Sequence, residues 1–160
     1  MLAHVNLYTY SSLKCIKAAE TLNAAAGYVL EFPTGKGDVT RTQTFLLCNV
    51  HKENPKMTGT EANLFVIEKA LSRINAHTEL DIYTEWASIY GAIANGWLKS
   101  WEQNGWTNSD GRKIASLQSW QRVATLLRPH LVTVYLQTEH KYRSWLQREV
   151  ETERRYVEIE

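Results

Sequence analysis

The sequence predicts a single α/β domain with a mixed five-stranded sheet flanked by helices. Two observations support this prediction. Over the first fifty residues, apolar and polar side chains alternate with the period of two that is typical of β-strands. Further along the chain, apolar residues recur with the period of a helix, and strands and helices then follow in turn. The expected order is three strands, a helix, a strand, helices, a strand and a last helix.

The first three strands are expected to form an antiparallel meander. They cover residues 4–10, 26–32 and 40–50, which are rich in β-branched and aromatic side chains. The segment PTGKGD separates the second strand from the third, and its proline and glycines are typical of a turn.

A change of period marks the first helix. Apolar side chains recur there at the spacing of one helical stripe, at Leu64, Ile67, Leu71 and Ile74. Either Thr58 or Thr60 is a suitable N-cap for this helix, because a threonine side chain can accept a hydrogen bond from the first turn.

The remaining elements alternate between strands and helices. We expect strands over residues 79–84 and 131–137, helices over 86–94, 97–103 and 117–127, and a last helix from Tyr142 onward. Asn104–Gly105 and Pro129 end two of these helices, and the segment TNSDGRKI is a polar loop. No repeat or linker interrupts the pattern, so we expect one domain over residues 1–160, with a charged helical tail from about residue 151.

Composition excludes several classes of protein. The chain is 44% hydrophobic and holds six Trp, eight Tyr and three Phe, which excludes a disordered chain. No segment approaches the ~18 apolar residues of a membrane span, and the first residues do not resemble a secretory signal. We therefore expect a cytoplasmic protein without a membrane partner. Cys15 and Cys48 form neither a disulfide framework nor a metal-ligand pattern, and are expected to be partly or fully buried thiols.

The charge of the chain argues against binding nucleic acid through bulk electrostatics. Eighteen basic and seventeen acidic side chains leave a net charge of +1. A nucleic-acid site would therefore depend on local patches. Residues 99–128 form one such basic segment, with five Lys or Arg against two acids.

Residues 79–121 resemble type 1 ribonuclease H. The strand ELDIYTEW is followed by ANGWLKSWEQNGW and DGRKIASLQSWQ, which match the family's Trp-rich helix, its Gly-Trp turn, its basic loop and the next helix. Two earlier segments also match: VNLYTYSS matches the family's first strand, and TGTEANLFVIEKAL matches its first long helix. The resemblance covers about residues 4–150 and implies a ribonuclease H-like fold.

The resemblance also implies a chemistry. The family cuts the RNA strand of RNA–DNA hybrids with two divalent metals, Mg²⁺ or Mn²⁺, held by four acids. The first three acid positions correspond here to Tyr10, Asn63 and Glu85, and the last helix opens as KYRSWLQRE without an aspartate. Glu85 is thus the one carboxylate at the matched positions and the first candidate metal ligand. The remaining candidate substitutes are Glu61, Glu139 and Glu149.

The resemblance implies further contacts with nucleic acid. His140 lies close to a family loop whose histidine aids product release. The family's substrate handle, which holds the DNA strand, corresponds to Trp97, Lys99, Trp101, Trp106, Arg112 and Lys113. Thr58 matches a position that contacts a DNA phosphate. Each has a structural alternative: we favour core packing for Trp101 and Trp106 and a solvated side chain for His140, and Thr58 serves equally as a helix cap.

Two functions follow from these matches. We favour a catalytically impaired or inactive relative that binds RNA–DNA hybrid or other nucleic acid through the retained cleft and handle, with a protein as a further candidate partner. The alternative is an active, metal-dependent hybrid endoribonuclease with a remodelled carboxylate site. If the first helix is matched two residues differently, Glu61 returns as an acid and the alternative gains weight.

Overall fold

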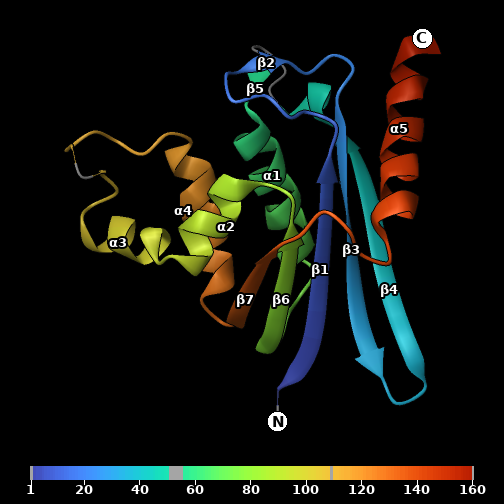
Figure 1. Ribbon diagram of the computed structural model, residues 1–160, viewed down its shortest axis with the longest axis horizontal. Helices are drawn as coiled ribbons and strands as arrows, with labels where there is room; N and C mark the ends of the chain where they lie inside the picture. The colour runs from blue at the N-terminus through green and yellow to red at the C-terminus, as the bar shows by residue number, and fades with distance from the viewer. Residues whose placement is uncertain (1, 51–55, 109, 160) are drawn as a thin grey trace.

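A five-stranded mixed sheet with the strand order β4–β3–β1–β6–β7 forms the centre of the protein (Figure 1). The computed structural model describes residues 2–50, 56–108 and 110–159. The strands of this sheet are β1 (Ala3–Ser11), β3 (Ala25–Thr34), β4 (Gly37–Leu46), β6 (Thr78–Thr84) and β7 (Leu131–Leu136). The first three pair antiparallel, whereas β6 runs parallel to both β1 and β7. The predicted fold class is therefore confirmed.

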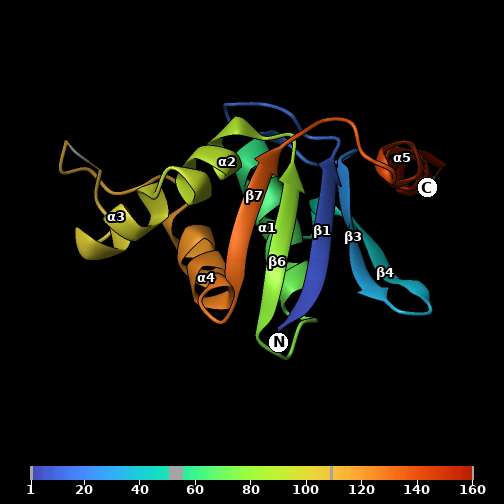
Figure 2. The same ribbon diagram turned by 60° about the horizontal axis from the view of Figure 1, so that its bottom comes forward.

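Helices cover both faces of the sheet. They are α1 (Gly59–Leu71), α2 (Ala87–Ala94), α3 (Trp97–Gln103), α4 (Leu117–Leu127) and α5 (Arg143–Ile159). Val5 and Leu7 of β1 share the main apolar core with α1 and α4, whereas Tyr8 and Tyr10 share a second cluster with α5. Because alternate residues of a strand point to opposite faces, α5 lies on the other side of the sheet from α1. Both views show α3 and the loop after it projecting away from the sheet (Figure 2).

The third strand ends earlier than the sequence predicts. It was expected to reach Val50, but β4 stops at Leu46 and a short 3-10 helix, η1, spans Leu47–Asn49. The physical reason is the partner strand, since β3 begins at Ala25, which pairs with Leu46. The amide of Leu47 donates to the carbonyl of Ala24, and among the described residues no paired strand continues the ladder beyond it.

Two other features differ from expectation. The first helix ends at Leu71, so Ile74 packs on the core from the following turn rather than from the helix. A small antiparallel pair, β2 (Ala19–Glu20) and β5 (Lys56–Met57), was missed, because two-residue strands leave no periodic pattern in a sequence. Within the described ranges, no helix combines the length and the apolar character needed to cross a membrane.

Candidate functional site

Tyr10, Asn63 and Glu85 meet at one end of the sheet. Strands β1 and β6 are parallel and in register up to Tyr8 and Tyr83, so their carboxyl ends bring the segments that hold Tyr10 and Glu85 side by side. The first turns of α1 contribute Asn63. All three line a cavity of about 100 Å³, and its other lining residues are Thr9, Ser11, Lys14 and Trp86. The three sequence-matched positions therefore lie together, although their role stays a prediction.

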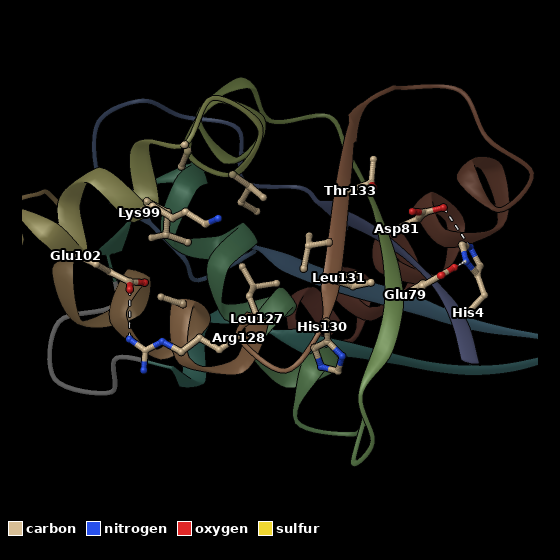
Figure 3. A pocket seen from close by; sticks show the side chains of 16 residues that line it. His4, Glu79, Asp81, Lys99, Glu102, Leu127, Arg128, His130, Leu131 and Thr133 are labelled. Atoms are coloured by element: carbon tan, nitrogen blue, oxygen red, sulfur yellow. Dashed lines mark hydrogen bonds and ion pairs between the residues drawn. The ribbon is translucent and has the colours of Figure 1, made fainter. Parts of the chain in front are cut away.

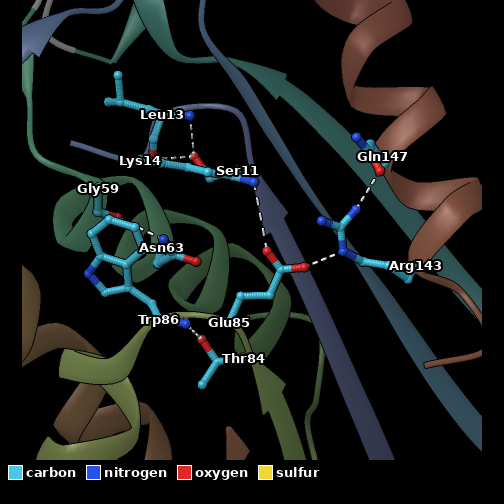
Figure 4. Close-up of polar contacts among 10 residues, drawn as sticks. All are labelled: Ser11, Leu13, Lys14, Gly59, Asn63, Thr84, Glu85, Trp86, Arg143 and Gln147. Carbon is cyan, nitrogen blue, oxygen red and sulfur yellow. Dashed lines mark hydrogen bonds and ion pairs between the residues drawn. The ribbon is translucent and has the colours of Figure 1, made fainter. Parts of the chain in front are cut away.

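Glu85 is paired with two cations. Its Oε1 accepts a hydrogen bond from Nε of Arg143, the first residue of α5, and its Oε2 lies 3.9 Å from Nζ of Lys14 (Figure 4). The side chains of Glu85 and Arg143 are only 20% and 14% exposed. Nη1 of Arg143 donates to Oε1 of Gln147, one turn further along α5, at 2.6 Å. The carboxylate is thus held by a guanidinium that is itself fixed in place.

The ring of Tyr10 contacts both cations. Cζ of Arg143 lies 4.6 Å from the ring centroid, and Nζ of Lys14 lies 4.9 Å from it. A cation over an aromatic face is attracted by the ring's negative face, and the attraction is stronger where water is excluded. Tyr10 is buried beside Leu146 and Val150 of α5. The tyrosine therefore helps to hold Lys14 and Arg143 on one side of the cavity.

Asn63 is held by the first turn of α1. Its Nδ2 donates to the carbonyl of Gly59 at 2.8 Å, and its side chain is buried. Gly59 is packed against the ring of Trp86, and a Cβ at this glycine would lie 2.3 Å from that ring. Only glycine permits this approach, which brings Trp86 against the start of α1 and closes one wall of the cavity.

The three candidate substitute acids lie elsewhere. Glu61 takes part in a capping box with Thr58: Oγ1 of Thr58 accepts from the amide of Glu61 at 3.1 Å, and the Glu61 carboxylate accepts from the amide of Thr58 at 3.4 Å. Glu139 and Glu149 are exposed, and neither lines the cavity. Among the residues that the structure describes, no three His, Cys, Asp or Glu side chains form a group that could hold a metal ion.

His140 belongs to an aromatic cluster on the same face of the sheet as α5. Its ring lies 4.6 Å from that of Tyr8, which stacks on Tyr83, which in turn stacks on Tyr135. Its Nδ1 accepts from the amide of Tyr142 at 3.2 Å. Burial, with the nearby positive charge of Arg143, lowers the pKa of His140 below its ordinary value. The expectation of a solvated His140 is therefore wrong, because its ring packs among aromatic side chains, and it does not line the cavity.

The tryptophans of the predicted handle divide into two groups. Trp101 packs edge to face on Trp120 of α4 at 5.4 Å, and both Trp101 and Trp106 are partly buried against the main core. Trp97 is 46% exposed, with its ring against Gly91 of α2. The preference for core packing of Trp101 and Trp106 agrees with these contacts, and Trp97 alone of the three presents a large exposed surface.

The basic residues of the handle do not converge. Arg112 and Lys113 are exposed in the loop between α3 and α4. Lys99 lines a separate cavity of about 730 Å³ between α3, α4 and the sheet (Figure 3). The far wall of that cavity is acidic, with Asp81 paired to His4 at 3.1 Å. The larger cavity therefore has mixed charge.

Two partners of Glu85 were missed from the sequence: Lys14, which lines the smaller cavity, and Arg143, which pairs with Glu85 beside it. Lys14 and Arg143 carry no motif of their own, and their role depends on where the chain brings them. The sequence offered one signal, the position of Arg143. It stands near the start of the last helix, where the resemblance implies an acid.

Curated proteins named Ribonuclease H match part of the chain. The one from Syntrophomonas wolfei is 32% identical over 92 residues, and the one from Prosthecochloris aestuarii is 27% identical over 82 residues. These matches cover 57% and 51% of this chain, and 63% and 56% of the two relatives. The chain thus matches little more than half the length of these relatives. No model of a known protein family matches it.

Solved structures match almost the whole chain. LC9-RNase H1, described as a type 1 RNase H with the type 2 active-site motif, gives a TM-score of 0.72 at 18% identity, covering 98% of this chain and 74% of that one. A foamy viral protease-reverse transcriptase in complex with RNA/DNA hybrid gives a TM-score of 0.61 at 14% identity, covering 98% of this chain and 20% of that one. At these identities the likeness establishes the fold alone.

Proposed function

Because the chain forms a ribonuclease H-like domain, we propose that it binds RNA–DNA hybrid or another nucleic acid and that its catalytic site is impaired or inactive. The observation that supports this proposal best is the pair formed by Glu85 and Arg143. The one carboxylate at the matched positions is already occupied by a cation of the protein itself.

The side chains in the cavity do not fit two divalent metals. Mg²⁺ and Mn²⁺ prefer several anionic oxygens that converge on one point. Here Tyr10 offers a phenol, Asn63 offers an amide that is bonded to Gly59, and Glu85 is shared between Arg143 and Lys14. A guanidinium beside the carboxylate also repels a divalent cation. These features support a domain that does not perform the two-metal reaction.

Binding of nucleic acid is supported by the exposed cations and the exposed tryptophan. Lys14 lines the cavity, and Lys99, Arg112 and Lys113 belong to the predicted handle. All four side chains are exposed and available to phosphates. The 46% exposed Trp97 offers an aromatic surface to sugars or bases. With a net charge of +1, the chain depends on such local groups rather than on its overall field.

A cleavage assay tests the catalytic part of this proposal. The purified chain is incubated with an RNA–DNA hybrid labelled on each strand, in Mg²⁺ and separately in Mn²⁺, beside the Glu85→Gln variant. We expect no cuts. Equal cuts from the wild-type chain and from Glu85→Gln would come from a contaminating nuclease and would agree with the proposal. Cuts confined to the RNA strand and lost in Glu85→Gln would instead establish an active enzyme with a remodelled site.

A binding assay tests the rest. Fluorescence anisotropy with a labelled hybrid should show salt-dependent affinity that exceeds the affinity for an unrelated polyanion such as heparin. Equal affinity for both would remove the case for nucleic-acid recognition. A protein partner would then be the remaining candidate.

A further inference from the structure

Around the cavity at the ends of β1 and β6, positive charge exceeds negative charge: Lys14 and Glu85 line it, and Arg143 pairs with Glu85 beside it. Lys14 follows β1, Glu85 follows β6 and Arg143 begins α5, so three segments far apart in the sequence bring two cations to one carboxylate. The other matched positions, Tyr10 and Asn63, are neutral. A site of this composition attracts an anion rather than a metal ion.

Both cations keep donors that the pair with Glu85 does not use. Arg143 uses Nε for Glu85 and Nη1 for Gln147, and within the described part of the chain no group accepts from its Nη2. Nζ of Lys14, at 3.9 Å from Oε2 of Glu85, is beyond hydrogen-bond distance, and its side chain is 50% exposed. The guanidinium and the ammonium can therefore still donate to a ligand.

One residue of the cavity lining carries an unpartnered polar group. Thr9 is 2% exposed, and its Oγ1 has no hydrogen-bond partner among the described groups. Buried hydroxyls are normally satisfied, so each exception calls for a partner. The volume of about 100 Å³ is larger than the ~30 Å³ that one water occupies in the liquid. A small group that accepts hydrogen bonds would fit there and satisfy Thr9.

We propose that Lys14, Arg143 and Thr9 form a binding site for a backbone phosphate of nucleic acid, and that this site works without a divalent metal. Arg143 supplies directed N–H donors, which suit the oxygens of a phosphate, and Lys14 supplies a mobile charge at the entrance. Glu85 and Gln147 act as positioning residues that hold the guanidinium in place. The inference rests on the proposed function, since it names the ligand group and the residues at the same site.

The test measures hybrid binding in EDTA over a range of KCl concentrations, using the full chain. The variants are Lys14→Gln, Arg143→Gln and the two combined. Lys36→Gln with Arg41→Gln is the matched control, because both residues are exposed at the far edge of the sheet and the same charge is removed. The Lys14 side chain is half exposed, so Lys14→Gln should leave the fold intact. Weaker binding by this variant is therefore not a result of unfolding.

We expect the wild-type chain to bind the hybrid in EDTA. The combined variant should weaken binding by about tenfold or more, the worth of one charge-assisted hydrogen bond. In a plot of log affinity against log salt concentration, the slope should become shallower by about one unit per cation removed. The matched control should change affinity by no more than about twofold, because its exposed charges are screened. Thr9→Val should weaken binding without changing the salt dependence.

The outcomes separate this inference from the function on which it rests. The phosphate site would be overturned, and hybrid binding left intact, if the combined variant and the control bind the hybrid equally well. The same holds if binding requires Mg²⁺. If neither the wild-type chain nor any variant binds the hybrid, the proposed function is contradicted. Titration with inorganic phosphate, followed through the backbone amide signals of residues 9–14 and 143, then decides whether an anion site exists: shifts lost in the combined variant support it, and no shifts overturn it.

Discussion

The guanidinium of Arg143 spans from the first residue of α5 to the carboxylate of Glu85, directly after β6. The pair therefore joins the helix on one face of the sheet to the end of a central strand. Glu85 is 20% exposed and Arg143 is 14% exposed, so each would be costly to leave without its partner.

Removal of one member of this pair should destabilise the protein. We expect Arg143→Gln to lower the free energy of unfolding by about 2 kcal/mol, because a largely buried carboxylate loses its main hydrogen-bond donor. Glu85→Gln together with Arg143→Gln should recover a large part of that loss, since no unpaired charge is left. Urea denaturation of the single and double variants gives the coupling energy. Strictly additive effects would show that the two side chains do not interact in solution.

Divalent metals should not stabilise the wild-type chain. Millimolar Mg²⁺ or Mn²⁺ should leave its melting temperature unchanged, because a ligand raises stability only when it binds the folded state. The variant Tyr10→Asp, Asn63→Glu, Arg143→Asp would place four carboxylates around the cavity and should gain a metal-dependent rise in melting temperature. A rise in the wild-type chain that Glu85→Gln abolishes would contradict this expectation and favour the active enzyme.

Two glycines that pack on tryptophan rings should differ in their tolerance of alanine. A Cβ at Gly59 would lie 2.3 Å from the ring of Trp86, and one at Gly91 would lie 2.6 Å from the ring of Trp97. Trp86 is held by a 2.7 Å hydrogen bond from Nε1 to Oγ1 of Thr60, whereas Trp97 is 46% exposed and free to shift.

We therefore expect Gly59→Ala to cost about 2 kcal/mol of stability through overpacking. Gly91→Ala should be close to neutral, because alanine gains about 1 kcal/mol in helix propensity. Thermal unfolding of the two variants is the measurement. Equal destabilisation would show that the ring of Trp97 is as constrained as that of Trp86.

Local signals in the sequence were sufficient for most elements of the fold. The helix over 117–127 was predicted with its observed bounds, because its apolar stripe is regular and Pro129 follows it. The end of β4 was not predictable from its own residues, since it depends on Ala25, where the partner strand begins. The residue at which a strand ends depends on its partner strand. The period of apolar residues within one segment does not report where that partner begins or ends.

The site divides in the same way. Tyr10, Asn63 and Glu85 could be found because they stand at matched positions on regular elements or directly after one, and the structure brings them to one cavity. Lys14 and Arg143 could not, since isolated basic residues are most often solvated. Their importance comes from a tertiary contact with Glu85, which no local pattern reports.

Protonation of Glu31 in acid should lower the stability of the fold. Its carboxylate is buried and accepts hydrogen bonds from Lys141, Tyr142 and Asn6. Burial alone would raise the pKa of Glu31, but these bonds outweigh it and hold the pKa below its ordinary value of 4.5. Because the folded state depresses this pKa, the stabilisation is fully present above about pH 4.5 and is lost as the pH falls through the lower folded value.

Urea unfolding of the wild-type chain and of Glu31→Gln, measured from pH 7 to pH 3, checks this expectation. Glu31→Gln keeps the size of the side chain but cannot ionise, so it should be less stable than wild type at pH 7. The difference should shrink towards pH 3, where the glutamate itself becomes protonated. A constant difference over the whole range would mean that the ionised form of Glu31 does not contribute to stability. Asp38→Asn serves as the control, because Asp38 also pairs with Lys141, at 3.3 Å, but is exposed, so its effect should be small at every pH.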